Sequence, residues 1–235
     1  MSSEKSFSER TKTKRSRSCS CSNPLLKSHR FVKPFDPPLD ALHSSLNPNQ
    51  SQSFLNCLPP PGVRDGQFLG RGCSKTVVAQ RRDGRIVAIL RSRINPLAEL
   101  AVMKSLQHHP HPHLLPLLAV ESNALSGAWM VVPIARFGSM YDLVDHLEFE
   151  GLSHFYTPWH ALKIHYQVST AVSHLASLGW HHGDLRARNV LAFRFGPLPA
   201  QTHVKLGDFG EAHKGKASNG DLLALKVELL SLVAF

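Results

Sequence analysis

The sequence predicts an α+β protein in which a small antiparallel sheet with one helix precedes a mostly helical region. Two observations carry this prediction: strand-like runs separated by turn residues fill residues 67–94, and apolar residues recur at helical spacing in residues 139–151 and 158–180. In addition, no apolar run reaches the roughly 18 residues that a membrane-spanning helix needs. We therefore expect no membrane-spanning segment.

The first 62 residues are expected to form a disordered basic leader before a folded domain at residues 63–235. The leader is rich in Ser, Pro and Asn and holds nine Lys or Arg against four Asp or Glu, a surplus of five in a chain of net charge +10. Such a segment buries too little apolar surface to offset the entropy lost on ordering. Its stretch "KTKRSRS" could serve nuclear import or nucleic-acid binding. No nucleic-acid-binding fold signature accompanies it, so we prefer a solvated tail and expect no specific nucleic-acid partner.

The expected location is cytoplasmic or nuclear. The N-terminus lacks the apolar region of a secretory signal. The four cysteines have neither metal-site nor disulfide-framework spacing, which suits a reducing compartment. The sequence predicts no particular oligomeric state.

Residues 63–137 are expected to hold the sheet and its helix. Residues 67–94 predict three strands joined by a glycine turn and by an "RDGR" hairpin turn. A helix over residues 95–109 should follow, because Asn95 and Pro96 are typical of a helix start and apolar residues then recur every three or four positions. Two further strands are expected at residues 113–122 and 127–134. The histidine-rich stretch "QHHPHPHLL" between helix and strand could bind a metal, but a plain connection is the preferred interpretation.

Residues 138–235 are expected to be mostly helical. Helices at 139–151 and 158–180 are followed by a polar loop at 181–189, a short strand, a second strand ending in "KLGDFG", and an apolar helix from Asp221 onward.

The candidate catalytic and metal-binding residues of this region lie in two stretches, first "HHGDLRARN" and then "KLGDFG". From Gln67 to Phe235, the order of motifs resembles the eukaryotic protein kinase family. The resemblance implies a two-lobed fold with an N-lobe at 63–137 and a partial C-lobe at 138–235 that ends after the helix following "DFG". It also implies ATP and Mg²⁺ as cofactors and a protein hydroxyl, of Ser, Thr or Tyr, as phosphate acceptor.

Within this resemblance, Asp184 matches the residue that accepts the proton of the substrate hydroxyl. Asn189 and Asp208 match the two magnesium ligands. His182 matches a histidine whose usual part is structural, packing against the "DFG" segment.

The stretch "LGRGCSKTV" resembles the glycine-rich loop that covers the nucleotide phosphates, with Lys75 in place of the third glycine. Glycine lets backbone N–H groups approach phosphate closely, although a plain hairpin turn uses glycine too. Val132 matches the residue before the hinge; the alternative is an ordinary core valine. The nucleotide contacts implied by the resemblance are Leu69, Gly70, Gly72, Val77, Ala88, Val132 and Ile134.

Leu90 stands where most kinases keep the lysine that holds the α- and β-phosphates. A leucine cannot hold phosphate, and Glu99, which matches the usual partner of that lysine, would be left unpaired. The loop around Lys75 is similar to that of the With-No-Lysine kinases, which use a lysine of the neighbouring strand. Lys75 is therefore a candidate catalytic cation, since its four-carbon stem could reach the same point. The alternative is a solvated loop charge.

Further departures concern control and substrate docking. Gly183 replaces the arginine that normally binds an activation-segment phosphate, which argues against that form of control. Only ten residues separate Gly210 from Asp221, and no "APE" motif follows. We expect either a fragment or a protein that diverged from peptide phosphorylation.

Three functions remain open at this point. The first is an active protein kinase, with Arg186 favouring tyrosine and the loop around Lys75 favouring serine or threonine. The second is a pseudokinase scaffold or nucleotide sensor, suggested by Leu90. The third is a small-molecule kinase, because "HGDL" and a short activation segment also occur in such enzymes.

Overall fold

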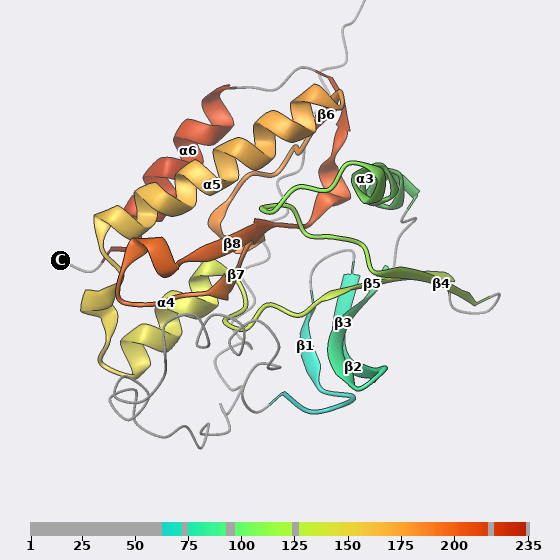
Figure 1. The fold of residues 1–235 in the computed structure, drawn as a ribbon, viewed down its shortest axis with the longest axis horizontal. Helices are drawn as coiled ribbons and strands as arrows, with labels where there is room; N and C mark the ends of the chain where they lie inside the picture. Colours follow the sequence, from blue (N-terminus) through green and yellow to red (C-terminus); the bar gives the residue numbers. More distant parts are fainter. Residues whose placement is uncertain (1–62, 72–74, 93–96, 124–126, 216–218, 234–235) are drawn as a thin grey trace, which may run out of the picture. The chain divides into compact units, whose positions relative to one another are not determined.

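The computed structural model describes residues 63–71, 75–92, 97–123, 127–215 and 219–233 (Figure 1). The predicted two-lobed α+β fold is confirmed. The N-lobe is an antiparallel sheet in the order β1-β2-β3-β5-β4, with one helix, α3 (Leu97–His108). The strands are β1 (Phe68–Arg71), β2 (Lys75–Arg82), β3 (Arg85–Ser92), β4 (Ala119–Asn123) and β5 (Gly127–Pro133). The leader predicted at 1–62 lies outside the described residues and stays a prediction.

The "RDGR" turn forms the expected hairpin between β2 and β3. Arg82 pairs with Arg85, so Asp83 and Gly84 make a two-residue loop. Both have a positive φ, 46° and 76°, which is the conformation that such a loop needs to match the twist of the strands.

The two faces of the sheet bury different residues because side chains alternate along a strand. Val87, Ile89 and Val131 form a small apolar cluster on one face. Ala88 and Leu90 belong to the main apolar core on the other face. Helix α3 adds buried side chains at Glu99, Val102, Met103 and Leu106.

The strand predicted at 113–122 is wrong in its first half, since β4 begins only at Ala119. Pro116 has no N–H to donate to a sheet, and the preceding residues bond elsewhere. Leu115 N–H donates to the Leu206 carbonyl, and Leu206 N–H donates to the His113 carbonyl, both at 2.9 Å. This segment therefore joins the N-lobe to the C-lobe instead of extending the sheet.

The C-lobe has three helices in its described part, and α5 and α6 lie side by side (Figure 1). α5 buries a regular stripe that includes Ile164, Val168, Ala171 and Leu175. Although α5 has 20 residues, neither it nor any other described helix has the length and hydropathy to cross a membrane. The helices are α4 (Met140–Phe149), α5 (Pro158–Ser177) and α6 (Asn219–Ser231).

Short strands and 3₁₀ turns form and flank the polar loop at residues 181–189. β7 (Val190–Arg194) pairs with β8 (His203–Leu206), and β6 (Trp180–His181) pairs with β9 (His213–Lys214). The β6–β9 pair was not predicted, because two residues carry no readable pattern. The 3₁₀ turns are η2 (Ser153–Phe155), η3 (Ala187–Asn189), η4 (Pro199–Gln201) and η5 (Phe209–Glu211).

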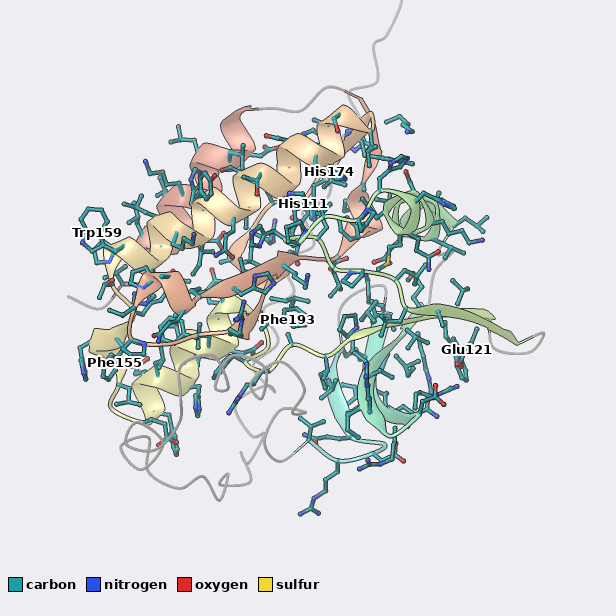
Figure 2. All side chains as sticks on the ribbon, viewed as in Figure 1. His111, Glu121, Phe155, Trp159, His174 and Phe193 are labelled. Carbon is teal, nitrogen blue, oxygen red and sulfur yellow. The ribbon has the colours of Figure 1, made fainter. Side chains whose placement is uncertain are left out.

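The histidine-rich connection packs against the C-lobe. Figure 2 shows His111 beside His174 of α5, and their rings stack with centroids 5.0 Å apart. His113 packs against His203 of β8, also with centroids 5.0 Å apart. In the part of the chain that the structure describes, no three metal-binding side chains form a group. These ring contacts join the connection to α5 and β8, and the interpretation of this stretch as a plain connection stays a prediction.

These histidines predict a loss of stability at acid pH. Burial lowers the pKa of His203 to about 4, with further contributions from Lys205, His113 and Arg194, and burial also lowers the pKa values of His111 and His113. Between pH 6.5 and about 4 the unfolded chain binds more protons than the folded chain, so stability falls as the pH drops through this window. We expect the unfolding midpoint of His203→Asn to fall less between pH 7 and pH 5 than that of the unchanged chain. The control is His154→Asn, at an exposed site; equal losses in all three proteins would contradict this account.

Candidate active site

Lys75 reaches into the space between the sheet, α3 and the "DFG" segment. Val77 pairs directly with Leu90, so both side chains point to the same face of the sheet, and Lys75, two residues before Val77, shares that face. Its Nζ lies 2.6 Å from Glu99 Oε1 and 2.6 Å from Asp208 Oδ1. One cation thus bridges α3 and the residue predicted to bind magnesium.

The Lys75–Glu99 pair is buried, with 7% and 4% of these residues exposed. Burial lowers the pKa of Lys75, but attraction by Asp208 and Glu99 outweighs it, so the pKa is raised above its ordinary value and Lys75 carries its charge. Glu99 is therefore not left unpaired by the leucine at position 90. Because Lys75 is buried, it is not a solvated loop charge. Its role in phosphate binding stays a prediction.

The polar loop after β6 brings Asp184 and Asn189 together. Asn189 Nδ2 donates to the Asp184 carbonyl at 2.8 Å and to Asp184 Oδ2 at 2.9 Å. Arg186 Nε donates to the other carboxylate oxygen, Asp184 Oδ1, at 2.7 Å. The Asp184 carboxylate is thus held at both oxygens, with 29% of its side chain exposed.

His182 links this loop to the "DFG" segment. Its Nδ1 accepts from Asp184 N–H at 3.3 Å, so its Nε2 carries the proton and donates to the Gly207 carbonyl at 3.0 Å. Burial lowers the pKa of His182, which keeps the ring neutral and this tautomer in place. The ring also meets Phe209 edge to face, with centroids 5.4 Å apart. The structural contact expected of His182 is therefore present.

Asp208 has the left-handed backbone conformation, with φ 61°, which Asp tolerates better than most residues. Its carboxylate contacts Lys75, while the next residue, Phe209, is fully buried. Gly207 N–H donates to the Asn189 carbonyl at 2.9 Å, which ties the segment before Asp208 to the end of the polar loop.

The donor set fits a magnesium ion. Asn189 and Asp208 offer oxygen ligands, the type that Mg²⁺ prefers, and 47% of the Asp208 side chain is exposed to an incoming ligand. Mg²⁺ usually takes one or two protein ligands and completes its shell with phosphate oxygens and water. A site of this kind needs no group of three protein ligands, and none is present in the described ranges.

The apolar residues predicted to contact the nucleotide all belong to the main apolar core or pack against it, although they come from β1, β2, β3, β5 and the residue after β5. These residues are Leu69, Val77, Ala88, Val132 and Ile134. Gly70 pairs with Val77 across the β1–β2 ladder. Gly72 lies outside the described residues. The contacts of these residues with a nucleotide stay predictions.

The backbone at position 183 requires glycine, independently of any role that an arginine there would have. Its φ is +80°, and a Cβ atom placed on it would lie 2.3 Å from the Glu211 carbonyl oxygen. The polar loop therefore passes too close to the segment after "DFG" for any side chain at this position.

Gly183→Ala is expected to lower the unfolding midpoint, because a left-handed conformation costs about 1–2 kcal/mol for a residue with a Cβ and the clash adds to it. Gly84→Ala is the matched control, since Gly84 has φ +76° and no atom within 4 Å of an added Cβ. Thermal unfolding of both variants isolates the clash with Glu211. Equal shifts in the two variants would show that the close contact carries no energy.

Two residues of the site escaped the sequence analysis. His181 Nδ1 accepts from Gly183 N–H at 3.0 Å and its Nε2 lies 3.2 Å from Asp221 Oδ2, so it ties the loop to α6. Glu228 of α6 accepts from Ala187 N–H at 2.8 Å. The signals were a doubled histidine and an acid among the apolar residues near the end of the last helix.

Comparison with known proteins adds two findings. The model of a family described as protein tyrosine and serine/threonine kinase matches residues 88–225. CBL-interacting protein kinase 22 of Oryza sativa subsp. japonica is 30% identical over 130 residues, which are 55% of this chain and 26% of that protein. The aligned part thus spans about a quarter of that relative's length.

Proposed function

The chain belongs to the protein tyrosine and serine/threonine kinase family, and from that premise we propose that it transfers the γ-phosphate of ATP to a protein hydroxyl with Mg²⁺ as cofactor. The acceptor is a Ser, Thr or Tyr side chain of a protein substrate, met in the cytoplasm or nucleus. CBL-interacting protein kinase 22 is a kinase by its name, which agrees with this class of reaction.

The observation that carries the proposal is the position of Lys75 Nζ, 2.6 Å from both Glu99 and Asp208. Phosphoryl transfer depends on positive groups that hold the phosphates, and the strand position usual for that lysine is Leu90 here. Lys75 supplies a buried, charged ammonium on the same face of the sheet. A site without any cation there would favour loss of transfer.

The remaining residues have complementary parts in this proposal. Asp184 accepts the proton of the attacking hydroxyl, and its two bonds from Asn189 and Arg186 orient the carboxylate for that task. Asn189 and Asp208 would hold the magnesium ion, which when bound neutralises charge on the phosphate oxygens. Leu69, Val77, Ala88, Val132 and Ile134 would enclose the adenine.

A nucleotide-binding pseudokinase is the second candidate. It is favoured by Leu90 and by the direct bond between Lys75 and Asp208, in which a protein cation takes one oxygen, Oδ1, of a predicted metal ligand. In this case the chain binds ATP without transferring phosphate.

One experiment separates the candidates. The purified full chain is incubated with Mg²⁺ and ATP labelled at the γ-phosphate, with one Ser/Thr peptide mixture, one Tyr peptide mixture and one aminoglycoside as acceptors. The proposal expects label on a peptide and an unfolding midpoint raised by ATP with Mg²⁺. A raised midpoint without transfer would establish the pseudokinase instead, and label on the aminoglycoside alone would indicate a small-molecule kinase.

A further inference from the structure

We propose that Glu228 of α6 is a positioning residue that holds the 3₁₀ turn η3, and through it Asn189 and Asp184, in the arrangement needed for transfer. This inference rests on the proposed function for its catalytic consequence. Its structural part, a carboxylate that caps a buried turn from a distant helix, stands independently.

The Glu228 carboxylate joins three elements of the C-lobe. Its Oε2 accepts from the backbone N–H of Ala187 at 2.8 Å, in the polar loop. Its Oε1 accepts from the hydroxyl of Tyr141, in α4, at 2.7 Å. Both oxygens are thus used, one for each neighbour.

The turn η3 needs an acceptor from outside itself. Arg186, the residue before the turn, makes no side-chain capping bond, because a guanidinium group has no acceptor for a backbone N–H. Ala187 is fully buried, so its N–H has no access to bulk water. A buried N–H without a partner is unfavourable, and Glu228 provides that partner.

The turn passes this constraint to the predicted catalytic groups. Asn189 N–H donates to the Arg186 carbonyl at 2.9 Å, which closes the turn that begins at Ala187. The Asn189 side chain then holds Asp184 through two bonds, at 2.8 and 2.9 Å. A displacement of Ala187 would therefore move both the predicted metal ligand and the predicted proton acceptor.

The surroundings of Glu228 indicate that its carboxylate has a specific role and is not simply a solvated surface charge. On α6 it lies between buried Leu225 and Leu229, where an acid brings no packing benefit. The electrostatic surroundings include two cations, since Arg188 and Arg186 lower the pKa of Tyr141 while its bond to Glu228 raises it more strongly. The carboxylate thus balances positive charge beside the loop while accepting the Ala187 bond.

The test compares Glu228→Leu with Glu228→Gln. Leucine suits the apolar neighbours but accepts no hydrogen bond. Glutamine keeps an oxygen that can accept from Ala187 N–H, and its amide N–H can donate to the Tyr141 hydroxyl oxygen. The matched control is Lys226→Leu, another charge-to-leucine change on the same helix. Three quantities are measured in the full chain: amide hydrogen exchange at Ala187, kcat and KM for phosphate transfer, and the unfolding midpoint.

We expect Glu228→Leu to speed exchange at Ala187 and to lower kcat by about 10- to 100-fold with KM for ATP nearly unchanged, because small misplacements of reacting groups have effects of this size. Glu228→Gln should recover most of both losses, and Lys226→Leu should show neither. A merely structural role would instead lower the unfolding midpoint in proportion to kcat, and that result would overturn the inference.

Unchanged exchange at Ala187 in Glu228→Leu would also overturn it, as would faster exchange with unchanged kcat. The exchange measurement needs no transfer activity. If the unchanged chain transfers no phosphate, the proposed function fails, and exchange at Ala187 alone still shows whether Glu228 caps the turn.

Discussion

Lys75→Met is expected to lower the rate of phosphate transfer by about 10²- to 10³-fold, the effect of removing one charged group that stabilises a developing charge. The variant is also expected to lose stability. Glu99 is 4% exposed and would be left as a buried, unpaired carboxylate, and breaking a buried pair in this way costs about 3–5 kcal/mol. Transfer assays and denaturant unfolding measure the two effects.

A double variant separates the two causes. Lys75→Met with Glu99→Gln removes the buried charge along with its partner, so most of the stability should return while transfer stays low. If the double variant regains transfer, Lys75 acts only by supporting the fold. If Lys75→Met alone transfers at the normal rate, Lys75 is not the phosphate cation.

Asp184→Asn is expected to lower kcat by about 10²- to 10⁴-fold, the usual contribution of a positioned proton acceptor. An amide in place of the carboxylate cannot take the hydroxyl proton, and its N–H₂ would face either Asn189 or Arg186, both of which are donors. Binding of ATP with Mg²⁺ should be retained, because Asn189 and Asp208 are unchanged. The rise of the unfolding midpoint with ATP and Mg²⁺ measures this binding.

The control for Asp184→Asn is Asp145→Asn, at an exposed acid of α4. This variant should transfer phosphate normally. An Asp184→Asn protein with kcat close to that of the control would contradict the assigned proton acceptor.

Local chemistry made much of the fold predictable. The "RDGR" hairpin and most of the helix predicted at residues 158–180 follow from short-range rules of turn conformation and apolar spacing, although α5 ends at Ser177 and Trp180 belongs to β6. The strand expected at 113–122 failed in part because His113 and Leu115 exchange backbone bonds with Leu206 of β8, a tertiary contact that no local pattern reveals.

The site was predictable only where its partners lie close in the sequence. Asp184 and Asn189 stand five residues apart and share one loop. Lys75 and Asp208 are 133 residues apart, so their contact depends on the sheet register and on the lobes meeting. Glu228 bonds to Ala187 across 41 residues, and within the sequence nothing distinguished it from an ordinary polar residue of a helix.

Gly183 illustrates how a departure from a family pattern can be reinterpreted. The sequence analysis took it as the loss of a phosphate-binding arginine. The structure adds that any Cβ here would meet the Glu211 carbonyl oxygen, 2.3 Å away. Restoring the arginine would therefore disturb the polar loop before it could bind a phosphate.

The most direct measurement is a crystal structure of the chain with Mg²⁺ and a non-hydrolysable ATP analogue. We expect Lys75 Nζ within about 3 Å of an α- or β-phosphate oxygen, since that is ordinary hydrogen-bond distance. Asn189 and Asp208 should coordinate the metal, and Asp184 should face the γ-phosphate. A nucleotide bound elsewhere, or phosphates in this site with Lys75 still bonded only to Glu99 and Asp208, would contradict the proposal that Lys75 supplies the cation missing at Leu90.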